Sequence, residues 1–223
     1  MATYAIGDIH GSLTALTTLI DAVNPSFEDT VITLGDYVDR GPDSMGCIEY
    51  LMGLQSKFEL VCLRGNHEVM MMQAAESPGK AAQWLGVGGR ETLLSYGASD
   101  PEGIPEAHWE FVRDTIPYFE TEHHIFVHAG IDPLVPMENQ SEWDLYWKFF
   151  DRPQPHVSGK VMICGHSAQR SAIPLSYRHA ICIDTYIYGG GWLTCLDVDS
   201  NTYIQANQKG EVRRDVIEIR DDI

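Results

Sequence analysis

The sequence predicts an α/β fold in which a parallel sheet carries a polar site along one edge. The N-terminal third alternates between segments of extended and of helical periodicity. Each early extended segment runs directly into a loop of glycine, aspartate, asparagine and histidine. Ligands of parallel α/β sheets bind beyond the carboxyl ends of the strands, so we expect a functional site at that edge.

Six segments of this region follow the order strand, helix, strand, helix, strand, helix. Apolar residues at helical spacing, from Leu13 to Val23, predict the first helix. The strands are expected at Thr3–Ile6, 30–34 and 58–63, and the helices at 13–23, Ser44–Leu54 and 67–75. This order is typical of a parallel sheet with covering helices.

The rest of the chain changes rhythm. Helical segments are expected between about residues 80 and 114, followed mainly by strands and by one helix over 138–150. The later strands are expected at 118–122, 125–128, Val161–Cys164, 180–184, 193–198 and 203–206. No linker, repeat or low-complexity tract divides the chain, so we expect a single domain over residues 1–223 with two sheets.

The composition and net charge exclude several classes of protein for this chain. Of 223 residues, 44% are hydrophobic and 21% are charged, which is typical of a soluble globular domain. The net charge of −17 argues against nucleic acid or an anionic membrane as partner. The sequence holds no membrane-spanning run and no signal peptide, so we expect a cytoplasmic protein. The five cysteines form no CxxC pair and are expected to be reduced, buried thiols.

The polar residues at the strand ends form a regular series. Asp8, Asp36 and Asn66 are each separated by roughly 30 residues, the length of one βαβ repeat. Two later apolar strands also run into a histidine. Carboxylate and imidazole donors together suit Mn, Fe, Zn or Co rather than Ca or a thiolate-bound zinc. The predicted metal ligands are Asp8, His10, Asp36, Asn66, His128 and His166.

These ligands are expected to hold two ions. Asp8, His10 and Asp36 would bind one ion, and Asp36, Asn66, His128 and His166 would bind the other. Asp36 is expected to bridge, because a carboxylate has two oxygens and can hold two ions roughly 3.5–4 Å apart.

Five short motifs make the chain recognisable. Gly-Asp-Ile-His-Gly (7–11), Gly-Asp-Tyr-Val-Asp-Arg-Gly (35–41), Arg-Gly-Asn-His-Glu (64–68), His-Ala-Gly (128–130) and Gly-His (165–166) occur in this order. Together they resemble the signature of the PPP family of serine/threonine protein phosphatases, within the calcineurin-like metallophosphoesterases. The resemblance covers about residues 3–198, and small bacterial and phage members look most similar.

The resemblance implies a four-layer α/β/β/α sandwich of the metallophosphoesterase type, with the metals between two mixed sheets. It also implies hydrolysis of phosphate monoesters, with phosphoserine and phosphothreonine of phosphoproteins or phosphopeptides as the expected substrates. Hydroxide provided by two divalent metal ions would attack phosphorus directly. Mn is the expected activator in vitro, with Fe, Zn or Co as alternatives.

The same resemblance implies helper residues. Arg40 would clamp the phosphate oxygens with its planar guanidinium. His67 would protonate the leaving alkoxide as general acid, oriented by Asp39. Asn66, besides binding a metal, would donate a hydrogen bond to a phosphate oxygen.

A second phosphate-binding arginine is displaced from its usual place. Many relatives carry it two positions after a tryptophan, but Phe149 occupies that position after Trp147. Arg152 lies at a similar distance from the His-Ala-Gly motif and is our expected substitute, with Arg170 as a second candidate.

Three other functions remain open from the sequence. The same scaffold serves symmetrical dinucleoside polyphosphate hydrolases. Cys164 and Arg170 fit the C-x5-R spacing of cysteine-dependent phosphatases, although that loop lacks the central glycines that a phosphate-binding loop needs. The third is an inactive module that holds phosphoproteins, and the complete ligand set argues against it.

Overall fold

The computed structural model describes residues 1–220, and within them the strands form two mixed sheets. The first sheet has the order β11-β10-β9-β1-β2-β3 and the second the order β4-β5-β6-β8-β7. The first sheet comprises β1 (Thr3–Ile6), β2 (Thr30–Thr33), β3 (Glu59–Cys62), β9 (Leu193–Asp197), β10 (Thr202–Ala206) and β11 (Val212–Val216). The second comprises β4 (Tyr118–Glu120), β5 (His124–Val127), β6 (Val161–Cys164), β7 (Leu175–Tyr177) and β8 (Ala180–Cys182).

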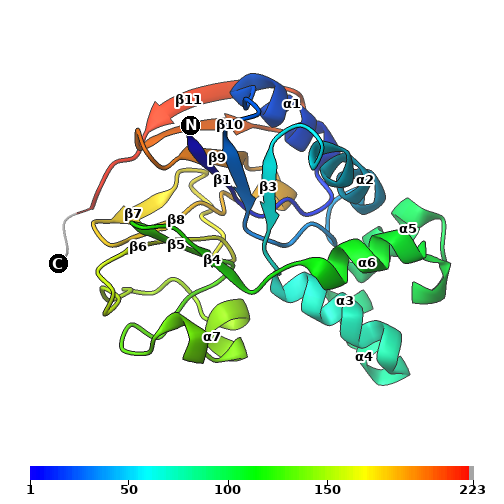
Figure 1. The fold of residues 1–223 in the computed structure, drawn as a ribbon. Coiled ribbons are helices and arrows are strands. Elements are labelled where there is room, and N and C mark those ends of the chain that lie inside the picture. The colour runs from blue at the N-terminus through cyan, green and yellow to red at the C-terminus, as the bar shows by residue number, and fades with distance from the viewer. Residues whose placement is uncertain (221–223) are drawn as a thin grey trace.

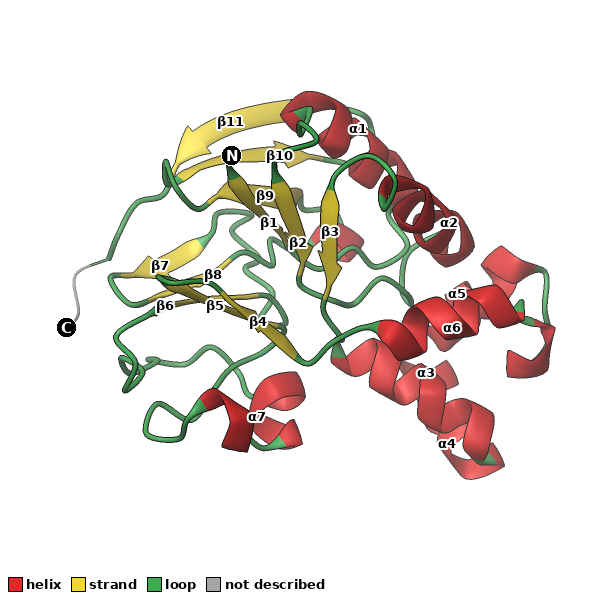
Figure 2. Cartoon of the chain, viewed as in Figure 1, coloured by secondary structure: helices red, strands yellow, loops and turns green. Residues whose placement is uncertain are grey.

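The helices cover the outer faces and one end of the sheets (Figure 1). Their bounds are α1 (Leu13–Val23), α2 (Ser44–Leu54), α3 (Asn66–Glu76), α4 (Pro78–Trp84), α5 (Arg90–Tyr96), α6 (Glu106–Asp114) and α7 (Glu142–Trp147). α1 and α2 lie outside the first sheet and α7 outside the second, while α3 to α6 extend to one side (Figure 2). This arrangement confirms the predicted fold class.

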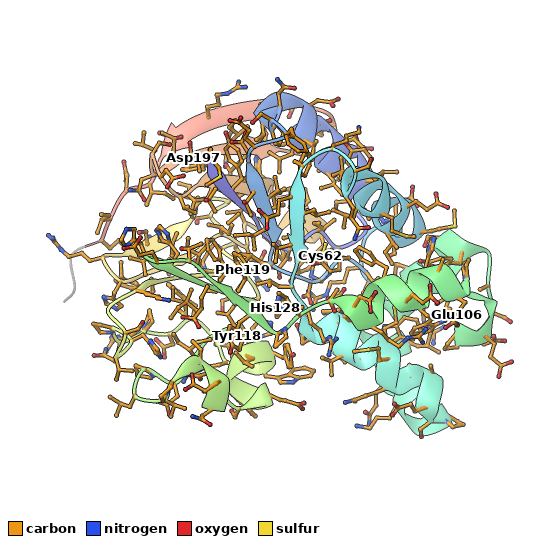
Figure 3. All side chains as sticks on the ribbon, viewed as in Figure 1. Cys62, Glu106, Tyr118, Phe119, His128 and Asp197 are labelled. Atoms are coloured by element: carbon orange, nitrogen blue, oxygen red, sulfur yellow. The ribbon has the colours of Figure 1, made fainter. Side chains whose placement is uncertain are left out.

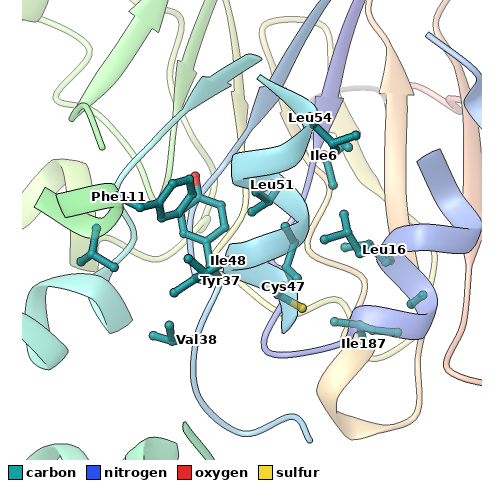
Figure 4. Packing of buried hydrophobic residues seen from close by; sticks show 14 of the residues in the cluster. Ile6, Leu16, Tyr37, Val38, Cys47, Ile48, Leu51, Leu54, Phe111 and Ile187 are labelled. Atoms are coloured by element: carbon teal, nitrogen blue, oxygen red, sulfur yellow. The ribbon is translucent and has the colours of Figure 1, made fainter. Parts of the chain in front are cut away.

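Strand alternation explains how the layers hold together. Ile6 of β1 packs toward α1 and α2, whereas its neighbour Ala5 packs toward the second sheet. Successive side chains of a strand point to opposite faces, so each central strand contributes to two cores. Figure 4 shows Ile6 and Leu16 in the core beneath α1 and α2.

The direction of pairing places the loops that follow the strands. β1, β2 and β3 are parallel neighbours, as the sequence predicted, while β9 runs antiparallel to β1. In the second sheet β5, β6 and β8 are parallel neighbours. The carboxyl ends of each parallel set therefore open on one edge of their sheet.

Two expectations about the elements were wrong. The helix expected over 138–150 is only α7, because Ser141 caps its start by accepting a hydrogen bond from the Asp144 backbone N at 3.1 Å. It ends at Trp147, since Lys148 is already extended (φ −72°, ψ 122°). Strands β7 and β11 were not expected, and β11 is exposed along its whole length, so it lacks the alternating apolar pattern that marks a strand.

The cysteines are free, as expected: Cys62 is partly buried, and Cys47, Cys164, Cys182 and Cys195 are buried. None of the helices formed by residues 1–220 is both long enough and apolar enough to cross a membrane.

Candidate metal centre

The residues predicted to bind metal lie just after five strands of the two sheets, on the loops that follow them or, for Asn66, at the start of α3. β1, β2 and β3 of the first sheet and β5 and β6 of the second precede these loops. They carry, in that order, Asp8 with His10, Asp36, Asn66, His128 and His166. Figure 3 shows His128 near the centre of the molecule. The two sheets thus bring together side chains that are far apart in the sequence.

Asp36 lies between the two halves of the site. Its Oδ2 is 3.4 Å from Nε2 of His10, and its Oδ1 is 3.5 Å from Nε2 of His128. Donor atoms of His10, Asp36 and His67 lie within 4.8 Å of one another, and so do those of Asp8, Asp36 and His128. Asp36 belongs to both groups, which is the arrangement of a carboxylate that bridges two ions.

The grouping differs from the sequence expectation at Asp8. Its carboxylate groups with His128 rather than with His10. The backbone N of His166 donates to Asp8 Oδ1 at 3.1 Å. A Cβ on Gly165 would lie 2.0 Å from the same oxygen, so only glycine fits there. The loop after β6 therefore packs directly on Asp8 and draws it toward the ligands of the second sheet.

Asn66 joins the two histidines of the second sheet. Its Oδ1 is 2.9 Å from Nε2 of His128 and 3.2 Å from Nδ1 of His166. The three side chains expected to share an ion with Asp36 are thus in contact.

Backbone carbonyls orient two of the imidazoles. Nδ1 of His10 is 2.9 Å from the carbonyl oxygen of Val38, and Nδ1 of His128 is 2.8 Å from that of Leu34. A carbonyl only accepts, so Nδ1 carries the proton and Nε2 is left with a lone pair. This outer hydrogen bond is the usual companion of a metal-binding histidine.

Burial and charge indicate cations at this position. Burial raises the pKa of Asp8 and of Asp36 well above the ordinary range and lowers the pKa of His10 and His128 well below it. Within residues 1–220, Nε2 of His166 is a buried nitrogen without a hydrogen-bond partner. Buried carboxylates and unpaired polar atoms are costly unless a cation offsets them. The donor set therefore fits two divalent ions of the borderline class.

The backbone at the site is held in an uncommon conformation. His10, Asp36, Asp39, Arg40 and His166 have φ of 44°, 51°, 72°, 68° and 61°. Left-handed backbone costs a non-glycine residue roughly 1–3 kcal/mol and persists where the surroundings enforce it. The rest of the fold thus offsets the conformational cost of holding these side chains in place.

His67 is oriented by Asp39. Nδ1 of His67 is 2.6 Å from Asp39 Oδ2, and both side chains are buried. Nε2 of His67 lies 3.9 Å from Asp36 Oδ2 and, within the described chain, has no hydrogen-bond partner. His67 therefore presents Nε2 to the site, which suits a proton donor to a leaving group.

Two residues that the sequence analysis did not single out hold Asp39. Trp84 Nε1 donates to Asp39 Oδ2 at 2.9 Å, and Thr92 Oγ1 donates to Oδ1 at 2.7 Å. Burial raises the pKa of Asp39 to about 7, and the hydrogen bonds from Thr92 and Trp84 act to lower it. The glycine-rich π-helical turn Leu85–Gly89, which links α4 to α5, places both donors here. The two donors that hold Asp39, and through it His67, therefore flank a glycine-rich turn that carries no recognisable sequence motif.

We expect Thr92→Val to lower kcat on a phosphoserine peptide about 10-fold, because it removes one hydrogen bond to the Asp39 carboxylate. The activity on p-nitrophenyl phosphate should change less than about 2-fold, since nitrophenolate leaves without protonation. Steady-state kinetics would measure both, with Thr14→Val on the exposed face of α1 as the matched control. Equal losses on the two substrates would contradict this role for Thr92.

Glu68 connects two of the ligand loops. Its buried carboxylate accepts hydrogen bonds from the backbone N of Asp36 at 2.8 Å, of Tyr37 at 2.8 Å and of Gly65 at 2.9 Å. A Cβ on Gly65 would lie 2.1 Å from Asp36 Oδ1, so the loops meet only because this residue is glycine. Glu68 positions Asp36 rather than reacting.

The arginines are placed differently from the sequence expectation. Arg40 donates from Nη1 to His10 Nε2 at 2.9 Å and lines a cleft of about 540 Å³, which we name the metal cleft, together with Asp36, Asn66 and Arg170. Arg152 is exposed and lines a separate cavity of about 190 Å³, and Phe149 borders both this cavity and the metal cleft. Of these two exposed arginines, Arg170 lines the metal cleft and Arg152 does not, so Arg170 is the better candidate for a second phosphate contact.

We therefore expect Arg170→Ala to raise KM for a phosphate ester about 10-fold, the loss of one exposed charge-assisted hydrogen bond. Arg152→Ala, which removes the same charge from an exposed residue outside the metal cleft, is the control and should change KM less than about 2-fold. A larger effect from Arg152→Ala would restore it as the phosphate ligand.

Two further residues of the site follow β8. Asp184 is buried, burial raises its pKa to about 6, and its charge acts to raise the pKa of Asp8. The ring of Tyr188 lies 4.4 Å from the Arg40 guanidinium carbon and 4.9 Å from the His10 ring. Both follow the Gly-His motif at 165–166 in the chain, and none of the five sequence motifs includes them.

The alternative mechanism through Cys164 does not fit. Cys164 is fully buried in the core on the outer face of the second sheet. Burial raises the pKa of its thiol well above the ordinary value, whereas a nucleophilic cysteine needs an exposed thiolate.

Comparison with known proteins adds sequence evidence. A family model described as calcineurin-like phosphoesterase matches residues 1–189. The symmetrical bis(5'-nucleosyl)-tetraphosphatase of Pseudomonas fluorescens strain SBW25 is 33% identical over 135 residues, which are 60% of this chain and 44% of that protein. The matched part of the chain thus spans less than half the length of this relative.

Solved structures share the architecture. A protein assigned as a diadenosine tetraphosphatase has a TM-score of 0.68 at 19% identity and covers 96% of this chain and 92% of its own. A cold-active protein tyrosine phosphatase has a TM-score of 0.69 at 14% identity and covers 95% of this chain and 78% of its own. At such identities the likeness shows the fold alone.

Proposed function

The chain belongs to the calcineurin-like phosphoesterase family, and on this premise we propose that it is a two-metal hydrolase of dinucleoside polyphosphates. Metal-dependent phosphoester hydrolysis follows from the family and from the buried His/Asp clusters. The substrate class is supported by the tetraphosphatase name of a relative at 33% identity.

The observation that carries the substrate class is the lining of the metal cleft. Arg40 and Arg170 line it beside Asp36, and Phe149 and Tyr188 add aromatic faces. Two guanidinium groups suit more than one phosphate, and aromatic rings suit a nucleobase. A volume of about 540 Å³ is in the range of nucleotide sites.

Each side chain has a role in the proposed reaction. Asp8, His10, Asp36, Asn66, His128 and His166 would hold the metals. When bound, such ions polarise the phosphate and lower the pKa of water. Arg40 binds the oxygens of the attacked phosphate, and Arg170 binds a neighbouring phosphate. His67 gives a proton from Nε2 to the leaving oxygen, and Asp39 stabilises the doubly protonated imidazole that this requires.

The second candidate substrate is a phosphoserine or phosphothreonine of a protein. The buried pair of His67 and Asp39 favours it, because a serine alkoxide is a poor leaving group and needs protonation. The phosphate end of a nucleotide leaves more easily. The ratio of kcat/KM on the two substrates therefore distinguishes the two candidate functions.

The test compares diadenosine tetraphosphate with a phosphoserine peptide, using protein reconstituted with Mn²⁺. We expect the higher kcat/KM on diadenosine tetraphosphate, with ADP as the only nucleotide product. A higher kcat/KM on the peptide would replace the proposed substrate by the second candidate.

Metal removal should have a separate, measurable effect. We expect exhaustive chelation to abolish turnover and to lower the melting temperature by several degrees, because metal binding stabilises only the folded state. Added Mn²⁺ should restore both, and calorimetry would record the shift. Full turnover by metal-free protein would rule out the two-metal mechanism.

A further inference from the structure

A second cleft adjoins the metal cleft. Its volume is about 320 Å³, and it is formed by Arg40–Pro42, by the turn 187–191 and by the tip of the β10–β11 hairpin at 207–209. We name it the lysine cleft after Lys209. Arg40 and Tyr188 line both clefts, so the two meet at this pair.

The linings of both clefts are unusual for so acidic a chain. The sequence has 32 aspartates and glutamates against 15 lysines and arginines. Among the described residues, the lysine cleft is lined by Arg40 and Lys209 and by no carboxylate. The metal cleft is lined by Arg40, Arg170 and a single carboxylate, the metal-binding Asp36. A polyanion is therefore attracted along this path and repelled by most of the remaining surface.

Arg40 is fixed at the junction of the two clefts. The ring of Tyr188 lies 4.4 Å from its guanidinium carbon and packs edge-on against the His10 ring. A cation over an aromatic face gains roughly 0.5–2 kcal/mol, which restrains a long side chain. Arg40 can thus hold phosphate oxygens at the boundary between the clefts.

The hairpin tip that carries Lys209 is also anchored. Gln208 Oε1 accepts a hydrogen bond from the Ala15 backbone N at 3.1 Å, in the first turn of α1. Asn207 Oδ1 accepts one from the Lys209 backbone N at 2.9 Å. The Lys209 side chain is exposed, while the backbone that bears it is tied to α1 beside the site. The Lys209 ammonium group is thus exposed at the lysine cleft, and the hairpin that bears it is held in place.

We propose that the lysine cleft binds the nucleoside diphosphate that leaves, with its phosphates between Arg40 and Lys209. The inference rests on the proposed function and adds a second subsite to it. Water bonds to the phosphorus of one inner phosphate, and the bridging P–O bond breaks. The bridging oxygen departs with the other half, so one tetraphosphate and one water give two nucleoside diphosphates and release protons to solvent. A substrate with a nucleotide on each side of the cleaved bond needs two adjoining clefts, and the metal cleft and the lysine cleft adjoin at Arg40 and Tyr188.

The experiment measures how ADP and inorganic phosphate inhibit p-nitrophenyl phosphate hydrolysis by the Mn²⁺-loaded full chain. The variants are Lys209→Ala, Lys209→Glu and, as a matched control for charge, Lys57→Ala at an exposed site outside both clefts. We expect the ADP inhibition constant to rise about 10-fold in Lys209→Ala, the effect of one charge-assisted hydrogen bond, and further in Lys209→Glu. Inhibition by phosphate and kcat on p-nitrophenyl phosphate should not change, and Lys57→Ala should match the parent protein. Titration calorimetry with ADP gives the same comparison without turnover.

The outcomes separate this inference from the proposed function. If the parent protein does not cleave diadenosine tetraphosphate but ADP inhibition depends on Lys209, the proposed function fails and the lysine cleft stands. If ADP inhibits no better than phosphate, or if Lys209→Ala and Lys57→Ala behave alike, the lysine cleft is refuted whatever the tetraphosphatase activity.

Discussion

Asp36→Asn is expected to lower kcat by at least about 10³-fold and to remove both metal ions, a larger loss than for any other single ligand. The two carboxylate oxygens of Asp36 face opposite halves of the site, 3.4 Å from His10 Nε2 and 3.5 Å from His128 Nε2. Asparagine has one acceptor oxygen and no charge, so it cannot bridge two cations.

Elemental analysis and steady-state kinetics would test this. Asp8→Asn is the comparison that should affect one ion. Asp21→Asn, on the exposed face of α1, is the matched control and should leave both ions and the activity unchanged. Asp36→Asn protein that kept both ions and more activity than Asp8→Asn would show that the bridging assignment is wrong.

His67→Asn should produce the second-largest effect, and the effect should depend on the leaving group. We expect kcat on a phosphoserine peptide to fall by roughly 10²–10⁴-fold, the usual contribution of a general acid. The loss on p-nitrophenyl phosphate and on diadenosine tetraphosphate should be below about 10-fold, since their leaving groups are stable anions.

The same variant distinguishes two roles that the geometry allows for His67, general acid and metal ligand. Its Nε2 lies near the donor atoms of His10 and Asp36, so His67 could serve as a metal ligand instead of an acid. Two ions retained in His67→Asn, with a leaving-group-dependent loss, would support the acid. One ion lost, with equal losses on all substrates, would make it a ligand. His123→Asn, at an exposed position, is the matched control.

The similar proteins favour a different substrate class from the one that the sequence motifs favoured. The resemblance to PPP-family protein phosphatases pointed first to phosphoproteins, with dinucleoside polyphosphates as the alternative. The chain belongs to the calcineurin-like phosphoesterase family, and its similarity to a tetraphosphatase favours dinucleoside polyphosphates as substrates. Motifs that bind metal and phosphate are the same for both substrates, so they cannot distinguish what is attached to the phosphate.

Local periodicity in the sequence was enough to predict most of the fold. β1, α1 and α2 have the predicted bounds within one residue, because each carries a regular apolar pattern and a clear stop. α7 was predicted too long, since apolar spacing alone did not reveal where Lys148 leaves the helix. β11 was missed because its pairing with β10 comes from the tertiary context and not from its own pattern.

By itself the sequence predicted the six candidate metal ligands. The ligands directly follow strands, and parallel strands of successive repeats deliver their ends to one edge, so a local pattern was sufficient to find Asp8, Asp36 and Asn66. Only the tertiary structure decided what surrounds them: the donors Trp84 and Thr92 on Asp39, the position of Arg170 and not Arg152 in the metal cleft, and the meeting of two clefts at Arg40. These features depend on contacts between segments far apart in the chain, such as Thr92 with Asp39, and side-chain spacing within one segment carries no record of such contacts.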